Sequence, residues 1–335
     1  MVQKILVTGG CGFIGSAFVR HLIESGQERV INVDKITYAA IPGALAGVES
    51  SARYHWEGVD ITEAEALAKV FAEQSPDAVV HFAAESHVDR SIAAPSDFVK
   101  TNVLGTFELL RVSLEHYHSL SPERQQRFRW IHVSTDEVFG PSTTELDEGA
   151  PYRPSSPYAA TKAAADHLVN AWRRTYGLPT LIARSSNNYG PYQLPDKLVP
   201  KAIRNALRGE GIPLYADGAQ LRDWMYVDDH VRALREVLSR GEVGASYHLA
   251  SGQRTSNLEV VERICQILDQ QKPKADGTSY ASQIVHVADR PGHDFSYAMS
   301  TDKARRELGW SASTPLEQGL RQTIQWLLES PGRLG

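Results

Sequence analysis

A short apolar run at the start of the chain leads directly into closely spaced glycines. Lys4-Ile5-Leu6-Val7 has the composition of a buried strand, and Thr8-Gly9-Gly10-Cys11-Gly12-Phe13-Ile14-Gly15 follows it at the start of an amphipathic stretch. Glycines at 9, 12 and 15 permit a tight turn, close backbone approach to a pyrophosphate and close packing of a helix on the strand. A lone glycine triplet is also compatible with a plain strand-to-helix turn. Its place between a strand and a helix predicts a dinucleotide site at the helix N-terminus.

The first half of the chain alternates short apolar runs with longer segments whose apolar residues recur at helical spacing. Runs rich in β-branched and aromatic residues predict strands at 4–7, 29–33, 53–57, 78–82, 128–133 and 180–183. The segments between them predict helices at 13–24, 63–73, 94–118 and 159–176. This alternation predicts an α/β fold, a doubly wound parallel sheet of the Rossmann type with helices on both faces.

The pattern changes after about residue 187, where Gly, Pro and polar residues become more frequent. Less regular segments are expected at 188–195, 209–221 and 275–296, and helices at 257–270 and 316–328. A further helical pattern at 227–239 is expected to return to the first domain. We therefore predict a dinucleotide-binding domain over 1–186, rejoined by 227–250, and a smaller α/β C-terminal lobe formed mainly by 187–335.

Composition argues against several classes of protein. The 335 residues carry a formal net charge of −5, and no basic stretch interleaved with aromatic residues indicates a nucleic-acid partner. Two cysteines, Cys11 and Cys265, are too few for a disulfide framework and favour a reducing compartment. The N-terminal run is too short for a signal peptide, and no apolar run approaches the ~18 residues of a membrane span, so a cytoplasmic location is expected. His and Cys residues lack the spacing of metal ligands, so no metal is expected.

An acidic residue at the end of the second predicted strand indicates which dinucleotide is bound. Asp34 lies 19 residues past Gly15, where a carboxylate can bind both ribose hydroxyls of the adenosine. It would repel a 2′-phosphate, so the expected cofactor is NAD, although the neighbouring Lys35 is a cation that could tolerate a phosphate. Asp60, after the third predicted strand, can accept a hydrogen bond from the adenine amino group or cap a helix.

A tyrosine and a lysine share one face of the helix predicted at 159–176. Tyr158 and Lys162 are four residues apart, one helical turn. A lysine ammonium beside a phenol favours the phenolate, which can take a proton from a sugar hydroxyl. Tyrosine and lysine recur at this spacing by chance, but the pair becomes specific when it follows a glycine motif in the same chain.

Together these motifs resemble the extended short-chain dehydrogenase/reductase family, over nearly the whole chain. The glycine motif and Tyr-x-x-x-Lys carry the family resemblance, and within the family the pattern is most similar to the dTDP-glucose 4,6-dehydratases. The segments that carry this closer resemblance are 34–39 (DKITYA), 81–91 (HFAAESHVDRS), 134–140 (STDEVFG), 184–193 (RSSNNYGPYQ), 222–227 (RDWMYV) and 290–294 (RPGHD).

The resemblance implies a lyase reaction in which NAD is reduced and then reoxidised in each cycle. Oxidation of the sugar at C4 makes the C5 proton acidic, water is lost across C5–C6, and the hydride returns to C6. Glu137 is implied as the base at C5 and Asp136 as the acid for the C6 hydroxyl, a division that needs two carboxyl groups in unlike environments. Thr135 is implied to hydrogen-bond the C4 oxygen beside Tyr158. Without the surrounding motifs, Asp136 and Glu137 could equally be loop-capping acids.

Further contacts follow from the resemblance alone. The residues implied to bind the cofactor are Gly9, Gly12, Phe13, Ile14, Gly15, Asp34, Lys35, Thr37, Asp60, Ile61, Ala83, Ala84, Ser86, Thr101, Tyr158 and Lys162. Those implied to bind the nucleotide sugar are Ser86, Thr135, Asn187, Lys197, Arg222, Asn257, Arg290 and Tyr297. Arginine suits a diphosphate because its planar fork donates two hydrogen bonds at once. Each residue of the nucleotide-sugar set could instead form a surface salt bridge or stabilise a loop.

Three positions depart from the family pattern. Phe139 stands where a tyrosine is usual, 39–42 departs from the usual Gly-Asn, and Phe295-Ser296 replaces a usual basic pair. Thymine is the default base of the implied substrate, dTDP-glucose, and uracil, as in UDP-glucose, stays open.

Other functions on the same scaffold are a nucleotide-sugar 4-epimerase or decarboxylase, which lack the Asp-Glu pair, and a catalytically silent NAD-binding protein. The intact Thr135, Asp136, Glu137, Tyr158 and Lys162 argue against the silent protein, since none is needed merely to hold NAD. We also expect a homodimer, because the long helices at 94–118 and 159–176 have broad apolar faces suited to a four-helix contact between subunits.

Overall fold

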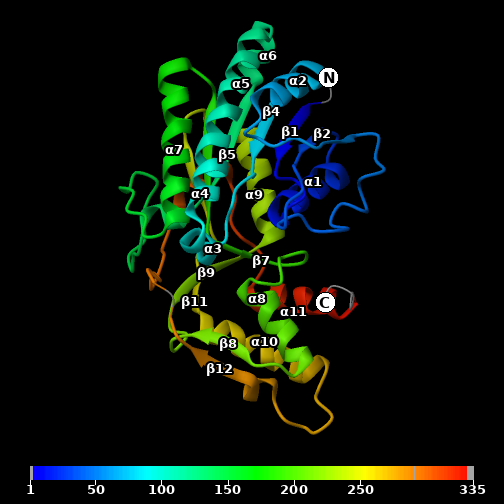
Figure 1. The fold of residues 1–335 in the computed structure, drawn as a ribbon, viewed down its shortest axis with the longest axis vertical. Coiled ribbons are helices and arrows are strands. Elements are labelled where there is room, and N and C mark those ends of the chain that lie inside the picture. The colour runs from blue at the N-terminus through cyan, green and yellow to red at the C-terminus, as the bar shows by residue number, and fades with distance from the viewer. Residues whose placement is uncertain (1–2, 290, 330–335) are drawn as a thin grey trace.

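The computed structural model describes residues 3–289 and 291–329 and contains a seven-stranded parallel sheet with the order β10-β6-β5-β4-β1-β2-β3 (Figure 1). Its strands are β1 Lys4–Thr8, β2 Arg29–Val33, β3 Tyr54–Glu57, β4 Ala78–His81, β5 Arg129–Thr135, β6 Thr180–Ser185 and β10 Ser246–Leu249. The order reverses at β1, as in doubly wound dinucleotide-binding sheets. The prediction of a Rossmann-type α/β fold is therefore confirmed.

Helices cover both faces of this sheet. One face carries α1 (Phe13–Ser25) and α9 (Val227–Arg240), which pack on each other, and the other carries α2 (Ala64–Gln74), α5 (Thr106–Ser119) and α7 (Pro157–Tyr176). Alternation along β1 explains the two cores. Ile5 and Val7 pack with α1 and α9, whereas Leu6 packs with α2, α5 and α7.

A smaller lobe lies at the lower end of the molecule in Figure 1. Its elements are β7 Asn187–Tyr189, α8 Leu198–Arg208, β8 Ile212–Tyr215, β9 Leu221–Tyr226, β11 Arg254–Ser256, α10 Asn257–Gln271, β12 Ile284–Val287 and α11 Leu316–Glu329. The strands form a β11-β9-β7 sheet and a β12-β8 pair. Three of them, β7, β8 and β12, lie wholly or mainly in segments expected to be irregular, because strands of three or four residues carry too little alternation to be recognised. The chain returns from this lobe to the large sheet through α9 and β10, which pairs with β6.

The helix predicted at 94–118 is not continuous. It consists of α4 (Pro95–Phe98), a π-helical stretch Val99–Gly105, and α5. Within the π-helical stretch, the buried Asn102 accepts from Glu85 N at 2.8 Å and donates to Thr161 Oγ1 at 3.0 Å. The π-helical turn therefore places the Asn102 amide against the loop after β4 and against α7. The apolar periodicity of the sequence runs through this stretch without interruption and does not predict the turn.

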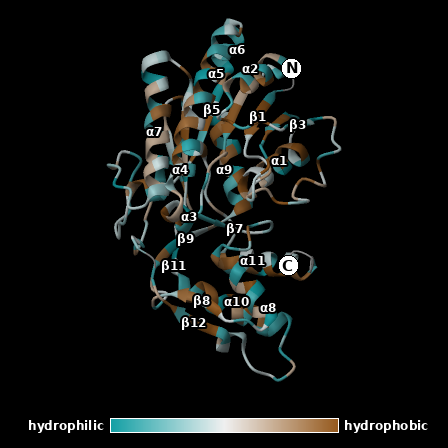
Figure 2. Ribbon diagram, in the orientation of Figure 1, coloured by the Kyte–Doolittle hydropathy of each residue, from teal (hydrophilic) through white to brown (hydrophobic). Residues whose placement is uncertain are grey.

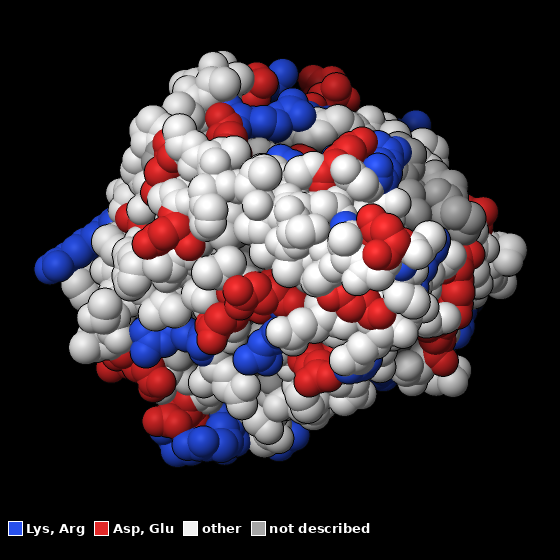
Figure 3. Space-filling view, turned by 90° about the horizontal axis from the view of Figure 1, so that it is seen from below, with Lys and Arg blue, Asp and Glu red and all other residues white. Residues whose placement is uncertain are grey.

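The remaining short helices are α3 Val88–Ala93, α6 Pro122–Arg127, and the single turns Asp136–Phe139, Tyr280–Gln283 and Ala304–Leu308. Hydrophobic residues concentrate on the strands and the inner helix faces (Figure 2). On the end of the molecule seen in Figure 3, acidic and basic side chains are interspersed, without a broad region of one sign. Over residues 3–289 and 291–329, no helix has the length and apolar character required to cross a bilayer.

Candidate active site

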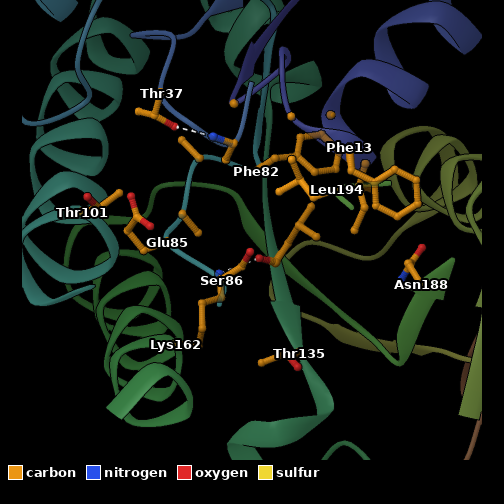
Figure 4. Close-up of a pocket in the computed structure, with 18 of the residues that line it drawn as sticks. Phe13, Thr37, Phe82, Glu85, Ser86, Thr101, Thr135, Lys162, Asn188 and Leu194 are labelled. Carbon is orange, nitrogen blue, oxygen red and sulfur yellow. Dashed lines mark hydrogen bonds between the residues drawn. The ribbon is translucent and has the colours of Figure 1, made fainter. Parts of the chain in front are cut away.

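A deep cleft lies at the carboxyl edge of the large sheet, bounded on the far side by the smaller lobe. Loops after β1, β2, β4, β5 and β6 line it, which is where open α/β sheets place ligands. All the predicted cofactor and catalytic residues line this cleft, together with Asn187 and Lys197. Figure 4 shows Thr37 at one end of the cleft, and Thr135 and Lys162 at the other.

The glycine loop has the shape that a pyrophosphate requires. Gly9 has φ +73°, and a Cβ on Gly15 would lie 2.2 Å from the carbonyl oxygen of Gly9, so neither position accommodates a side chain. A Cβ on Gly12 would meet nothing nearer than 3.4 Å and would occupy the cleft itself. No side chain caps the N-terminus of α1, so its first backbone N–H groups are available to an anion. These residues fit a bound dinucleotide.

The carboxylate of Asp34 shapes the loop that receives the adenosine. Its Oδ2 accepts from Cys11 N at 2.9 Å and its Oδ1 from Ile36 N at 2.9 Å. Lys35 instead pairs with Asp60 at 2.9 Å, and the other Asp60 oxygen accepts from Thr62 N at 3.0 Å. Because Asp60 neutralises Lys35, the charge that could tolerate a 2′-phosphate is already balanced.

Two neighbouring carboxyl groups differ sharply in environment. Asp136 is buried and 3.1 Å from Thr135 Oγ1, whereas Glu137 is partly exposed to the cleft. Burial, and secondarily the charge of Glu137, raise the pKa of Asp136 to about 8. Asp136 therefore keeps its proton at neutral pH and can donate it, which is the unlike environment that an acid and base pair needs.

The protonation state of Tyr158 in the structure differs from the expected one, in which Lys162 favours the phenolate. Burial raises the pKa of Tyr158, and the charges of Glu137 and Asp136 raise it further, while a hydrogen bond with Thr135 lowers it. The Lys162 ammonium donates to the carbonyl oxygen of Val133 at 2.7 Å. Burial in the cleft wall lowers the pKa of Lys162 to about 8. The sequence spacing is therefore right, but the protein alone holds the tyrosine protonated.

The predicted residues of the nucleotide-sugar site are not all brought to the cleft wall. Arg222 is buried and donates to the carbonyl oxygens of Leu221, Asp294 and Phe295, with its guanidinium 4.6 Å from the Tyr297 ring centroid. Neither residue lines the cleft, but both are close enough to the Asp136–Glu137 pair to interact electrostatically with it.

Two further residues of that predicted set lie elsewhere. Asn257 is the first residue of α10 and does not line the cleft; its backbone N–H donates to Gln220 O. Arg290 lies outside the described residues. His293, within the resemblance segment 290–294, has its Nδ1 2.6 Å from the Asp289 carboxylate.

Two ring residues have structural surroundings. His81 is fully buried between Thr8 Oγ1, at 2.7 Å, and Thr106 Oγ1, at 3.0 Å, and burial lowers its pKa to about 3. Phe139, the departure from the family tyrosine, stacks on Tyr152 with a centroid distance of 5.6 Å. Neither His81 nor Phe139 lines the cleft, and both pack against neighbouring side chains in the interior.

Several cleft residues were not predicted. Those that sequence reasoning missed include Phe82, Glu85, Asn188, Gln193 and Leu194. All five lie within or next to the two resemblance segments at 81–91 and 184–193, so their position in those segments was the available signal. Over the described residues, no group of three or more His, Cys, Asp or Glu side chains is arranged to hold a metal ion.

Comparison with known proteins identifies similar chains at full length. The model of the GDP-mannose 4,6-dehydratase family matches residues 6–323. The dTDP-glucose 4,6-dehydratase of Shigella flexneri is 50% identical over 337 residues, covering 97% of this chain and 93% of that protein. The corresponding enzyme of Neisseria meningitidis serogroup B is also 50% identical, with 98% and 94% covered.

Solved structures give the same picture. The dTDP-glucose 4,6-dehydratase of Streptomyces venezuelae, solved with NAD bound, superposes with a TM-score of 0.89 at 41% identity, covering 98% of both chains. The UDP-glucose 4-epimerase of Thermotoga maritima, solved with UDP-glucose, has a TM-score of 0.86 at 28% identity, covering 98% of this chain and 100% of that one. The dehydratase is thus the more similar in sequence of these two structures.

Proposed function

This chain belongs to the GDP-mannose 4,6-dehydratase family, and we propose on that premise that it is an NAD-dependent dTDP-glucose 4,6-dehydratase. The product is the 4-keto-6-deoxy sugar nucleotide, and one molecule of water leaves per turnover. The observation that carries the proposal is the Asp136–Glu137 pair in the cleft, with Asp136 buried and protonated and Glu137 open to the ligand. A cytoplasmic enzyme is also consistent with Cys11 and Cys265, which are both free thiols.

Each residue at the sheet edge has a defined task in this reaction. Tyr158 takes the proton of the C4 hydroxyl, and Thr135 hydrogen-bonds the C4 oxygen. Glu137 takes the C5 proton, which the C4 ketone has made acidic, and Asp136 gives its proton to the departing C6 hydroxyl. Glu137 then returns its proton to C5 when the hydride adds to C6. The glycine loop and Asp34 would hold NAD, which would supply the acceptor and donor for the hydride and, when oxidised, a positive charge that favours the Tyr158 phenolate.

The lobe formed mainly by 187–335 holds the nucleotide in this proposal. Asn187 and Lys197 line the cleft on the side opposite the glycine loop. Lys197 donates to the carbonyl oxygen of Ser86 at 3.3 Å. Arg222, Tyr297 and Asn257 are proposed to contribute from behind this surface. For Arg222 to bind the diphosphate, it must exchange carbonyl partners at 294–295 for phosphate oxygens.

Incubation of the protein with dTDP-glucose and, separately, with UDP-glucose tests the function. We expect dTDP-glucose to give the 4-keto-6-deoxy product, detected by its alkali-induced absorbance and by mass spectrometry as loss of water. Deuterium placed at C4 of the hexose should reappear at C6. Isomerisation without loss of water would instead identify a 4-epimerase. Turnover of UDP-glucose but not of dTDP-glucose would show that the nucleobase of the substrate is uracil and not thymine.

We also propose a homodimer built on the π-helical stretch, α5 and α7. Val99, Leu104 and Tyr176 are 52%, 45% and 50% exposed on these elements. Phe107 and Trp172 pair edge to face between α5 and α7, with centroids 5.6 Å apart, and so join the two helices into one surface. Exposed apolar side chains on adjacent long helices suit a symmetric four-helix contact.

Sedimentation velocity at micromolar concentration tests this interface. The native protein is expected to sediment as a dimer and Leu104→Arg as a monomer, because a buried unpaired guanidinium is costly at an apolar contact. The matched control is Val285→Arg, an equally exposed valine on β12 of the smaller lobe, which should leave the dimer intact. A monomeric native protein, or a dimeric Leu104→Arg, would contradict the proposal.

A further inference from the structure

A buried chain of charged and polar groups lies behind Lys162, away from the cleft. Lys162 Nζ is 3.3 Å from His132 Nε2, and the same nitrogen of His132 is 3.5 Å from Asp166 Oδ1. Lys162, His132 and Asp166 are 4%, 1% and 0% exposed. The ammonium of the cleft residue and a carboxylate that solvent does not reach therefore lie beside the same imidazole nitrogen.

The carboxylate is held in place from its far side. Asp166 Oδ2 accepts from Arg184 Nε at 2.9 Å and from the Tyr152 hydroxyl at 3.0 Å. Arg184 also donates to the Tyr152 hydroxyl. Within the described part of the chain, Asp166 Oδ1 has no hydrogen-bond partner and faces His132 instead. One oxygen of the carboxylate thus anchors it, and the other is directed at the lysine side.

Protonation of His132 determines what this arrangement does. Burial, with the nearby charges of Lys162 and Arg184, lowers the pKa of His132 well below its usual value, so the ring is uncharged. With its proton on Nδ1, a neutral ring offers the Nε2 lone pair to the Lys162 ammonium. The second ammonium hydrogen goes to Val133 O, at 2.7 Å, which leaves the third for the cleft.

Charge explains why a carboxylate stands behind the ring. Lys162 and Arg184 are two buried cations, and Asp166 is the anion between them. Lys162 interacts electrostatically with His81 from β4, His132 from β5 and Asp166 from α7. Arg184 from β6 acts on His132, and Glu137 and Asp136, in the turn after β5, act on Tyr158. Burial lowers the pKa of Lys162, and Asp166 opposes that effect.

We propose that Asp166 and His132 together keep Lys162 charged and directed into the cleft, with His132 as acceptor of one ammonium hydrogen and Asp166 as the nearby anion, which makes Asp166 a positioning residue. This inference rests on the proposed function, because a charged Lys162 serves to stabilise the Tyr158 phenolate during oxidation at C4. Asp166 itself does not line the cleft.

The test compares Asp166→Asn with the native holoenzyme. The readout is the rate at which reduced nicotinamide appears in the first turnover with dTDP-glucose, measured as a function of pH. This step comes before water loss, so the titration of Asp136 as a proton donor does not affect the measured rate. Removing an anion lowers the pKa of a nearby ammonium, so the alkaline limb should move about one pH unit toward acid. The rate should fall about fivefold at pH 8 and approach a tenfold fall at higher pH, and the two enzymes should converge at lower pH, where Lys162 is charged in both.

Asp229→Asn is the matched control. Asp229 is equally buried, pairs with Arg232, and accepts from Ser313 N and Thr314 N, but it does not line the cleft. Both variants are expected to unfold at a lower temperature, and Asp166→Asn alone should move the pH profile. A folded Asp166→Asn with the native alkaline limb overturns the proposal.

Two variants at His132 carry the test if Asp166→Asn does not fold. His132→Phe should lower the first-turnover rate about tenfold with unchanged KM, and His132→Gln, which retains an acceptor for the ammonium, should restore most of it. The proposal would be overturned if both variants reduced the nicotinamide at the rate of the native enzyme.

A readout without catalysis separates this inference from the proposed function. The pH dependence of Lys162 acetylation by acetic anhydride, followed by peptide mass spectrometry, should shift toward acid in Asp166→Asn even if no sugar nucleotide turns over. Failure to turn over dTDP-glucose would reject the function alone, whereas an unshifted acetylation profile would reject the role of Asp166.

Discussion

Glu137→Gln is expected to stop water loss and to leave NAD and the sugar nucleotide bound. The amide has nearly the same size as the carboxylate but cannot take the C5 proton, so the expected fall in 4-keto-6-deoxy product is about 10²–10⁴-fold. Oxidation at C4 precedes this step and needs Tyr158 and Lys162. Reduced nicotinamide should therefore accumulate on the enzyme after dTDP-glucose is added, which stopped-flow absorbance measures directly.

The matched control for this variant is Glu123→Gln, which changes the net charge equally at an exposed acid in the first turn of α6. It should dehydrate the sugar at the native rate. Native turnover in Glu137→Gln would mean that another group removes the C5 proton. A loss of product without accumulation of reduced nicotinamide would place Glu137 in the oxidation step.

Gly15→Ala should empty the dinucleotide site. Its Cβ would stand 2.2 Å from Gly9 O and 2.9 Å from Gly10 Cα, both backbone atoms that cannot rotate away. Relief of that overlap must move α1 off β1 or distort the loop, which costs about 1–3 kcal/mol of folding free energy and misplaces the N–H groups that face a pyrophosphate. We expect at least a tenfold loss of NAD affinity, measured as cofactor released per chain on acid denaturation after dialysis.

Gly47→Ala provides the comparison for the glycine variant. A Cβ at Gly47 meets nothing within 4 Å, and the residue is exposed on the loop after β2. This variant should retain the cofactor and the native unfolding temperature. Equal cofactor content in Gly15→Ala and the native protein would show that the close contact between the loop and α1 is not required.

The sequence predicted the large domain well because its signals are local. Strand β2 was placed at its observed bounds, and β1, α1 and α2 within one residue at each end, since apolar periodicity and β-branched composition are properties of neighbouring residues. Short strands of the smaller lobe, such as Ile284–Val287, escaped notice because their pairing with distant partners, and not their own pattern, makes them strands.

The cleft shows the same division. The spacing of the glycines and of Tyr158 and Lys162 marked the dinucleotide loop and the catalytic pair, and the family resemblance supplied most of the other cofactor and catalytic residues. All of these predicted residues line the cleft. The substrate set was less well placed. Arg222 is engaged with carbonyl oxygens at 294–295, and Asn257 lies at the start of α10, because resemblance gives residue types in order but not which side chain reaches the cleft.

The sequence by itself determined the order of elements and the dinucleotide loop, and it marked Thr135, Asp136, Glu137, Tyr158 and Lys162 as candidate reacting side chains. Only the tertiary structure decided their protonation. Burial keeps Asp136 an acid, burial and then the charges of Glu137 and Asp136 raise the pKa of Tyr158, and Asp166 opposes the loss of charge on Lys162. Burial and the charges of α7, β9 and the turn after β5 set those pKa values, and elements far apart in the chain meet only after folding.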